Sequence, residues 1–241
     1  KKMAYHIHAI DIPRTRHIHK KEMPKLGGVA MFLGFLLGYM LFCNQTNQMI
    51  SILIGSFLII LTGIFDDINP LSSKVKFLGQ VAAAIVVVYY GGIVMQDVSA
   101  YGIYLNFGMF AKPLTIIFIV ALVNCMNFVD GMDGLAGGIA EIYFITISII
   151  IYITGIYNGL DASLTLIMMG AILGFLVYNF YPAKIFMGDS GSVFLGYMIA
   201  VVSLLGFKNV TITSFVVPVL ILAIPILDTL FAIIRRLLKG Q

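Results

Sequence analysis

Eight apolar runs, separated by short polar connections, divide the 241-residue sequence. A helix needs about 20 apolar residues to cross the hydrocarbon of a bilayer, and about 17 is the minimum. Hydrophobic residues make up 60% of the chain and charged residues only 11%, against about 25% charged residues in soluble domains. A soluble fold could not bury so much apolar surface, and a disordered chain would not contain it. The sequence therefore predicts an all-α, polytopic membrane helix bundle with about eight transmembrane helices, over residues 27–43, 49–65, 77–95, 113–129, 135–154, 162–180, 191–207 and 212–232.

The distribution of basic residues predicts the orientation of these helices. If residues 1–26 are cytoplasmic, the inner connections carry thirteen of the 15 Lys and Arg residues, and the outer connections carry only Lys112 and Lys208. Membrane proteins show this bias towards the cytoplasm. The net charge of +4 therefore reflects topology, and we expect no nucleic acid partner. Residues 97–112 alternate in polarity and contain two glycines, which predicts a small hairpin on the outer side.

Acidic residues also gather on the predicted inner side, although they contribute little to orientation. A carboxylate beside an apolar helix end is costly unless it is paired or bound to a metal. Each of these residues alone would suit an ordinary turn or N-cap, but together they predict one polar site at the inner membrane face. They come from three separate connections: Asp66, Asp67, Asp130, Asp133 and Asp189.

The adjacent pair Asp66 and Asp67 ends an apolar run. Adjacent positions on a helix point about 100° apart, so the two carboxylates are expected to have different partners. One would face a metal or substrate and the other a neighbouring lysine. Lys76 lies nine residues after Asp67, on roughly the same side of a continued helix.

The block over residues 124–138 has the most specific pattern in the chain. Asn124, Asn127 and Asp130 are spaced three residues apart, which places them along one helical stripe. Their amide and carboxylate oxygens suit a hard divalent cation such as Mg²⁺. Gly131 and Gly134 allow tight turns beside this stripe. The alternative is an Asx-turn between two helices.

Four further features remain open between a functional and a structural role. Asp189 begins an apolar helix, where an acidic residue is also an ordinary N-cap. Phe186, in an inner connection, would be able to stack on a base. The basic segment 11–28 could hold a diphosphate, or it could simply anchor the cytoplasmic side. Glu141 lies inside a predicted span, and we expect it to hydrogen-bond a neighbouring helix in preference to a functional role.

The sequence resembles the polyprenyl-phosphate N-acetylhexosamine-1-phosphate transferases over nearly its whole length. The resemblance rests on four ordered motifs: residues 11–28, the pair Asp66-Asp67, residues 124–138 and residues 186–192. The residues of the first and third motifs are more similar to those of the N-acetylglucosamine-1-phosphate branch than to those of the muramoyl-pentapeptide branch.

The resemblance implies transfer of N-acetylglucosamine 1-phosphate from UDP-N-acetylglucosamine to undecaprenyl phosphate, with release of UMP. This would be the first membrane step of teichoic acid or surface polysaccharide synthesis. Carried over by motif, Asp189 would bind Mg²⁺ (or Mn²⁺ as an alternative), with Asn127 as a second ligand. Asp66 and Asp67 would be catalytic or would position the lipid phosphate, and the resemblance leaves open which of them is the base.

The same resemblance implies the residues that bind substrate. Phe186 would stack on uracil, and Asn179 and Asp133 would lie near the nucleoside. Lys76 would contact phosphate, and Lys20, from the basic segment, is the further candidate for binding substrate. The enzyme would lie in the bacterial plasma membrane with its active site on the cytoplasmic face, and family members often form homodimers.

The chain departs from the family pattern at both ends. We expect a single transferase domain over residues 1–241 that lacks the family's first helix, its C-terminal His-rich loop and its last helices. One alternative is a phospho-N-acetylmuramoyl-pentapeptide transferase, which differs in the UDP-sugar. A transporter is disfavoured, because transporters bind near the bilayer midplane and the acidic residues here, apart from Glu141, lie at one edge.

Overall fold

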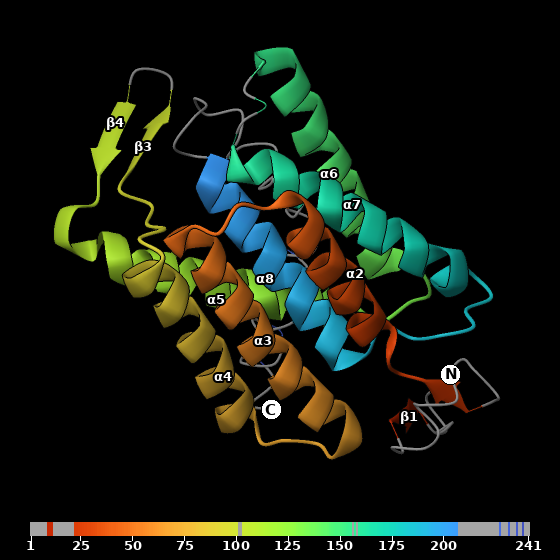
Figure 1. The fold of residues 1–241 in the computed structure, drawn as a ribbon. Coiled ribbons are helices and arrows are strands. Elements are labelled where there is room, and N and C mark those ends of the chain that lie inside the picture. The colour runs from red at the N-terminus through yellow and green to blue at the C-terminus, as the bar shows by residue number, and fades with distance from the viewer. Residues whose placement is uncertain are drawn as a thin grey trace.

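The computed structural model describes residues 9–11, 22–100, 103–155, 157 and 159–206, together with Leu227, Phe231, Arg235 and Leu238. Long helices dominate it, and two short antiparallel strand pairs lie at its edges (Figure 1). A π-helical turn over Val86–Tyr90 extends α4, and a 3₁₀ turn over Gly108–Phe110 precedes α5. The elements are β1 (Ile10–Asp11), β2 (Met23–Pro24), α2 (Gly27–Phe42), α3 (Asn47–Ile68), α4 (Ser73–Ile85), β3 (Asp97–Ala100), β4 (Ile103–Asn106), α5 (Ala111–Val129), α6 (Leu135–Thr154), α7 (Leu160–Asn179) and α8 (Gly188–Gly206).

Among the described residues, six helical segments are long and apolar enough to cross a membrane. They are Asn47–Ile68, Ser73–Tyr90, Gly108–Val129, Leu135–Thr154, Leu160–Asn179 and Gly188–Gly206. Helix α2 is apolar but has only 16 residues. The eighth predicted span, 212–232, lies outside the described residues except for Leu227 and Phe231. The polytopic membrane bundle is therefore confirmed, whereas the count of eight stays a prediction.

Helix α8 is the centre of the bundle. It packs against α2, α3 and α5, and Figure 1 shows it enclosed between these helices. Every residue from Ser190 to Leu205 except Val193 is buried. A helix that is hydrophobic all round is expected to lie in the interior, where no face meets the solvent or the lipid. The site residues at the start of α8 therefore stand on the most rigidly enclosed element of the fold.

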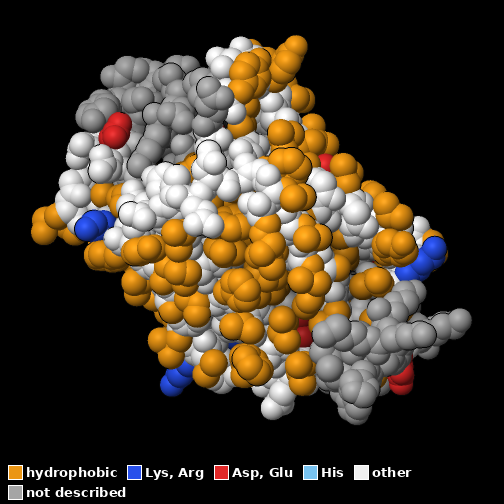
Figure 2. Space-filling view, in the orientation of Figure 1, with side chains coloured by type: hydrophobic (Ala, Val, Ile, Leu, Met, Phe, Trp, Pro, Cys, Tyr) orange, Lys and Arg blue, Asp and Glu red, His pale blue; other side chains and the backbone are white. Residues whose placement is uncertain are grey.

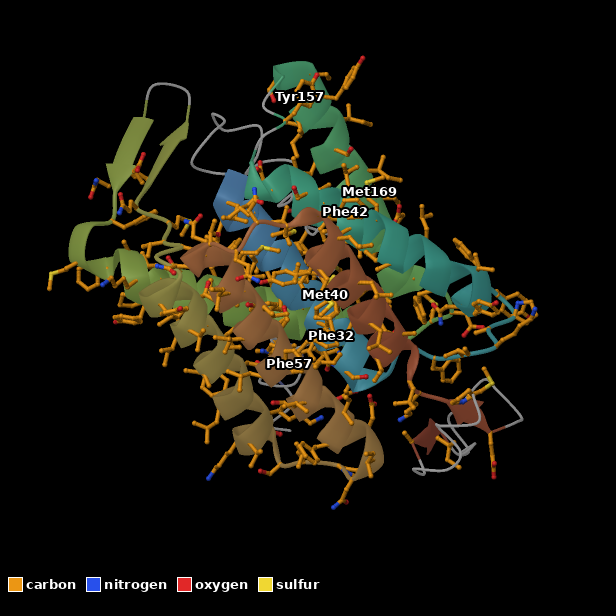
Figure 3. The ribbon with its side chains drawn as sticks, viewed as in Figure 1. Phe32, Met40, Phe42, Phe57, Tyr157 and Met169 are labelled. Carbon is orange, nitrogen blue, oxygen red and sulfur yellow. The ribbon has the colours of Figure 1, made fainter. Side chains whose placement is uncertain are left out.

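Aromatic side chains join α8 to the two helices in front of it. The ring of Phe32 on α2 lies 5.1 Å from that of Phe57 on α3 and 5.6 Å from that of Phe194 on α8, both in edge-to-face contact. Figure 3 shows Phe32 and Phe57 turned towards each other across α2 and α3, while Met40 and Phe42 lie further along α2. Edge-to-face pairs of this kind add about 0.5–1.5 kcal/mol beyond the area that they bury.

The outer surface of the bundle is apolar. Figure 2 shows hydrophobic side chains covering much of the face formed by α2, α3 and α4. Leu41 is 73% exposed and Leu78 is 65% exposed, and many other large hydrophobic residues are exposed as well. Exposed apolar surface on this scale requires a nonaqueous surrounding. It is the surface that a membrane protein presents to lipid.

Two glycines bring the neighbouring backbones close to the start of α8. A Cβ atom at Gly28 would overlap the backbone of Gly191, and one at Gly63 would overlap the backbone of Ser190. Backbone cannot move aside as a flexible side chain can. The first turn of α8 is therefore seated directly against α2 and α3.

We expect Gly63→Ala to destabilise the protein by about 1–3 kcal/mol, because the added methyl group must push α3 away from α8. Gly174→Ala is the matched control, because a Cβ atom there meets nothing within 4 Å. It should leave stability unchanged or raise it by up to about 1 kcal/mol. Thermal unfolding in detergent measures both effects. Equal stability of the two variants would show that the contact with Ser190 is not tight.

The predicted hairpin is confirmed, while its place on the outer side stays a prediction. Strands β3 and β4 pair antiparallel, with Asp97 opposite Asn106 and Ala100 opposite Ile103. In Figure 1 this hairpin and the connection between α3 and α4 lie at opposite ends of α4. The hairpin is thus remote from the polar site described below.

Glu141 does not make the hydrogen bond that the sequence led us to expect. Its side chain is buried in α6, and neither carboxylate oxygen has a hydrogen-bond partner among the described residues. The face of α6 that carries it is apolar, because Gly137, one turn earlier, packs against Leu176 and Phe175 of α7. The expectation of a bond to a neighbouring helix is therefore wrong.

Candidate active site

Three helix ends meet in one cluster of charges. Asp66 lies in the last turn of α3, Lys76 in the first turn of α4 and Asp189 in the first turn of α8. The Lys76 Nζ lies 2.5 Å from Asp66 Oδ2 and 2.9 Å from Asp189 Oδ2. One ammonium group therefore bridges two carboxylates that are 123 positions apart in the sequence. The structure brings these three site residues together, while their roles stay predictions.

Asp66 holds the turn that places Lys76. It is buried, and its Oδ1 accepts a hydrogen bond of 2.7 Å from the backbone N–H of Leu71. That bond closes the short connection between α3 and α4. The side chains of Lys76 and Asp189 are more open, at 34% and 37% exposed. The open side of the cluster is therefore formed by Lys76 and Asp189, and Asp66 lies behind them.

Asp67 points to a different partner, as the 100° offset between adjacent helical positions predicts. Its Oδ1 accepts from the backbone N–H of Asp189 at 2.9 Å, and its Oδ2 accepts from that of Ser190 at 3.0 Å. These two N–H groups belong to the first turn of α8, where no intrahelical acceptor exists. Asp67 thus caps α8 from another helix.

Asn127 reaches the same turn from α5. Its Nδ2 donates to Ser192 Oγ at 2.9 Å, and Ser192 lies close to the carbonyl oxygens of Gly188 and Asp189. The Oδ1 of Asn127 has no hydrogen-bond partner among the described residues. Asn124, the first residue of the predicted stripe, instead donates to Gln80 Oε1 on α4 at 2.6 Å. Asn127 is therefore the member of the pair that contacts the start of α8, through Ser192.

Asp130, the third residue of the predicted stripe, lies beside the charged cluster. It follows α5, and burial together with the negative charges of Asp189 and Asp67 raises its pKa to about 7, while the Lys25 cation opposes this shift. The signal was its position three residues after Asn127, at the end of the helix. Of the basic segment before α2, Lys25 lies close enough for its charge to act on Asp130 and Asp189, whereas Lys20 lies outside the described residues.

The raised pKa of Asp130 predicts how stability depends on pH. The folded protein favours the neutral carboxyl group, so it loses stability as pH rises from about 4 to about 7 and no further above that. We expect Asp130→Asn to be as stable as the parent protein at about pH 4 and more stable at about pH 8. Thermal unfolding in EDTA across this range measures the difference. A parallel pH dependence in both proteins would contradict it.

Asp133 and Asn179 hydrogen-bond the connection before α6 to the connection before α8. Asp133 Oδ2 accepts from the Ala183 N–H at 3.0 Å. Asn179 Oδ1 accepts from the Gly134 N–H at 3.0 Å, and its Nδ2 donates to the Ile185 carbonyl at 2.9 Å. These bonds fix the connection before α6 against the connection before α8. The predicted contact of Asp133 and Asn179 with a nucleoside stays a prediction.

Phe186 is held by its backbone. Its N–H donates to the Pro24 carbonyl at 2.9 Å, and its carbonyl accepts from the Gly27 N–H at 3.0 Å. The segment before α2 therefore pairs with the segment before α8. The half-buried ring of Phe186 lies three residues before Asp189, so a group stacked on it would be close to the charged cluster.

Among the residues that the structure describes, no group of three or more His, Cys, Asp or Glu side chains is arranged to hold a metal ion by itself. Asp130 lies close enough to Asp189 and Asp67 for their charges to raise its pKa. Asn127 contacts the start of α8 through Ser192, so these residues offer oxygens around the Asp189 carboxylate. Such a set suits an ion that also takes ligands from substrate and water.

Comparison with known proteins gives the family. Residues 49–207 match the model of glycosyl transferase family 4. The chain is 46% identical to the probable undecaprenyl-phosphate N-acetylglucosaminyl 1-phosphate transferase of Bacillus subtilis, covering 100% of this chain and 68% of the relative. It is 34% identical to a decaprenyl-phosphate N-acetylglucosaminephosphotransferase of Mycobacterium tuberculosis (99% and 67% covered).

A phospho-N-acetylmuramoyl-pentapeptide-transferase of Staphylococcus carnosus is 33% identical, with 78% of this chain and 64% of the relative covered. The chain thus spans about two thirds of the length of these relatives. The higher identity and coverage of the first two relatives confirm the N-acetylglucosamine branch that the motifs indicated. From the family match and these relatives together, the chain belongs to glycosyl transferase family 4, among the polyprenyl-phosphate N-acetylhexosamine-1-phosphate transferases.

Proposed function

We propose that this enzyme transfers N-acetylglucosamine 1-phosphate from UDP-N-acetylglucosamine to undecaprenyl phosphate and releases UMP. The name of the Bacillus subtilis relative supports this acceptor and this sugar. The observation that carries the proposal is the bridge from Asp66 through Lys76 to Asp189, formed by three helices at one end of the bundle. The product would be the first lipid-linked intermediate of teichoic acid or surface polysaccharide synthesis.

The reaction exchanges one phosphorus–oxygen bond for another. An oxygen of the lipid phosphate attacks the β-phosphorus of the UDP-sugar, and the bond from this phosphorus to the bridging oxygen of UMP breaks. When the lipid phosphate attacks as a dianion, no net proton transfer is needed. Negative charge on the phosphoryl oxygens has to be neutralised, and the reacting groups have to lie in line. Lys76, on the open side of the cluster, supplies a cation for this purpose.

We propose Mg²⁺, or Mn²⁺ in its place, as the cofactor. Asp189 and Asn127 would hold it, and Asp130 joins them as a third candidate. The donor set fits, because all three residues offer oxygen and because Asp130 stands among the negative charges of Asp189 and Asp67. Mg²⁺ usually keeps several waters and binds through one or two carboxylates plus substrate phosphates. When bound, it would neutralise charge on the diphosphate.

We also propose that the site faces the cytoplasm. The described basic residues at the end of the bundle that carries the site include Lys25, Lys74, Lys76 and Lys184, whereas Lys112 lies near the hairpin at the other end. This asymmetry follows the positive-inside rule. Phe186 would then receive the uracil of the cytoplasmic nucleotide, with Asn179 and Asp133 behind it.

The test uses the full-length protein in nanodiscs with undecaprenyl phosphate and Mg²⁺. With UDP-N-acetylglucosamine we expect release of UMP and a lipid product whose mass corresponds to undecaprenyl diphosphate N-acetylglucosamine. A lipid product formed only from UDP-N-acetylmuramoyl-pentapeptide would replace the proposal with the peptidoglycan alternative. Movement of intact UDP-sugar into vesicles, with no lipid product, would replace it with transport.

A further inference from the structure

The first turn of α8 is fixed by groups that come from other helices. A helix usually satisfies its first N–H groups with the side chain of its own N-cap residue. Met187, which precedes α8, has an apolar side chain, and Gly188, its first residue, has none. The acceptor is therefore the carboxylate of Asp67, 122 residues away from Asp189. Both oxygens of Asp67 are engaged, one with the Asp189 N–H and one with the Ser190 N–H.

The backbone around Asp67 is shaped for this contact. Gly188 adopts a φ of +74°, and a Cβ atom there would overlap the Lys25 carbonyl oxygen and stand 2.6 Å from Asp67 Oδ2 and 2.8 Å from Oδ1. Any larger residue would therefore displace the carboxylate. Gly63 lies one turn before Asp67 on the same helix, and its missing side chain lets α3 contact Ser190 directly. The same face of α3 thus supplies both the close approach and the hydrogen bonds.

Asp189 links the contact made by Asp67 to the charged cluster. Asp189 is bound to Asp67 through its backbone N–H at 2.9 Å and to Lys76 through its Oδ2 at 2.9 Å. A shift of the first turn of α8 would therefore carry the Asp189 carboxylate away from Lys76. Asp67 itself meets the backbone of α8 and not the open side of the cluster.

We propose that Asp67 is a positioning residue for phosphoryl transfer, which fixes the start of α8 and so holds the Asp189 carboxylate against Lys76, and that it is not the base. This inference rests on the proposed function, because its test measures turnover. It separates the roles of the adjacent carboxylates: Asp66 positions Lys76, and Asp67 positions Asp189.

The decisive comparison is Asp67→Asn with Asp67→Ala in the full-length enzyme. Asparagine cannot act as a base, but its carbonyl oxygen still accepts from the start of α8, whereas alanine offers no acceptor. We expect turnover to fall about 10-fold in Asp67→Asn and about 100-fold in Asp67→Ala, by loss of one or two hydrogen bonds of about 1.5 kcal/mol or less each. If Asp67 were the general base, both variants would remove it, and turnover would fall by the same factor of about 10²–10⁴ in each. Equal losses would therefore overturn the proposal.

Two further measurements separate a positioning role of Asp67 from a role as the base and from an unrelated loss of activity. The acid limb of the pH–rate profile should keep its midpoint in Asp67→Asn, and its disappearance would identify Asp67 as the base. Gly188→Ala leaves Asp67 in the chain but crowds both its carboxylate and the Lys25 carbonyl oxygen, so it should also lower turnover. Because Gly188→Ala and Asp67→Ala both disturb the same contact, the double variant should lose less turnover than the product of the two single losses. Independent, multiplicative losses would contradict the proposal.

The matched control is Asp97→Asn, which makes the same chemical change on the exposed hairpin. It should retain the turnover of the parent protein. Thermal unfolding of each variant shows whether lost activity follows from lost folding, and a turnover loss that tracks unfolding alone would also contradict the proposal. If the parent protein forms no lipid product, the proposed function fails. If the parent is active and Asp67→Asn equals Asp67→Ala, only the positioning role fails.

Discussion

Asp189→Asn should lower the turnover of the UDP-sugar by about 10³-fold, the largest loss that we expect from a single substitution. Asparagine has nearly the same shape, and the backbone N–H that binds Asp67 is unchanged, so α8 should keep its place. What disappears is the negative charge beside Lys76 and an anionic oxygen that a hard divalent cation prefers. The loss should therefore appear in catalysis and not in folding.

The measurement is UMP release at saturating UDP-N-acetylglucosamine, repeated over a Mg²⁺ titration. The half-saturating Mg²⁺ concentration should rise in the variant, because one of the proposed ligands is weakened. Asp97→Asn again serves as the control for the chemical change. Turnover within about threefold of the parent at saturating Mg²⁺ would remove Asp189 from the site.

Lys76→Met should lower turnover by about 10²–10³-fold, the cost that removal of one charge-stabilising group typically has. Methionine keeps the length of the side chain but not the cation. It also leaves the buried carboxylate of Asp66 without its ammonium partner, which should cost about 1–3 kcal/mol of stability. Turnover and thermal unfolding should therefore both respond.

A second substitution separates these two effects. Adding Asp66→Asn to Lys76→Met removes the unpaired charge, so stability should return while turnover stays low. Recovery of turnover in the double variant would show that Lys76 has only a structural role. Lys74→Met is the matched control, because Lys74 is exposed on the same helix turn and should retain full activity.

The helices could be predicted closely where local residues set their limits. Helix α6 begins and ends at the predicted residues, 135 and 154, since Gly134 and Gly155 flank it with φ angles of +73° and +71°. The third span was predicted at 77–95 but runs over 73–90, because Lys74 and Lys76 are helical although they are not apolar. Apolar content locates a span in the bilayer, whereas a helix continues beyond it for as long as its backbone bonds are satisfied.

The candidate site could be predicted as a set of residues but not as a set of contacts. The periodicity of a helix predicted that Asp66 and Asp67 would have different partners, and they do. It could not predict that the partner of Asp67 is the backbone at Asp189, because that contact depends on how α3 packs against α8. The same limit applies to the bond between Asn124 and Gln80, which turns one predicted polar residue away from the site.

The enclosure of α8 extends the region in which a substitution can impair chemistry. Gly196 lies two turns beyond Asp189, and a Cβ atom there would stand 2.6 Å from the Leu122 carbonyl oxygen and from the Val123 Cα atom of α5. A helix confined on several sides accommodates such a collision by sliding along its axis or tilting as one piece. Substitutions that inactivate the enzyme would then be found deep within the hydrocarbon layer, at positions that no water-soluble nucleotide reaches.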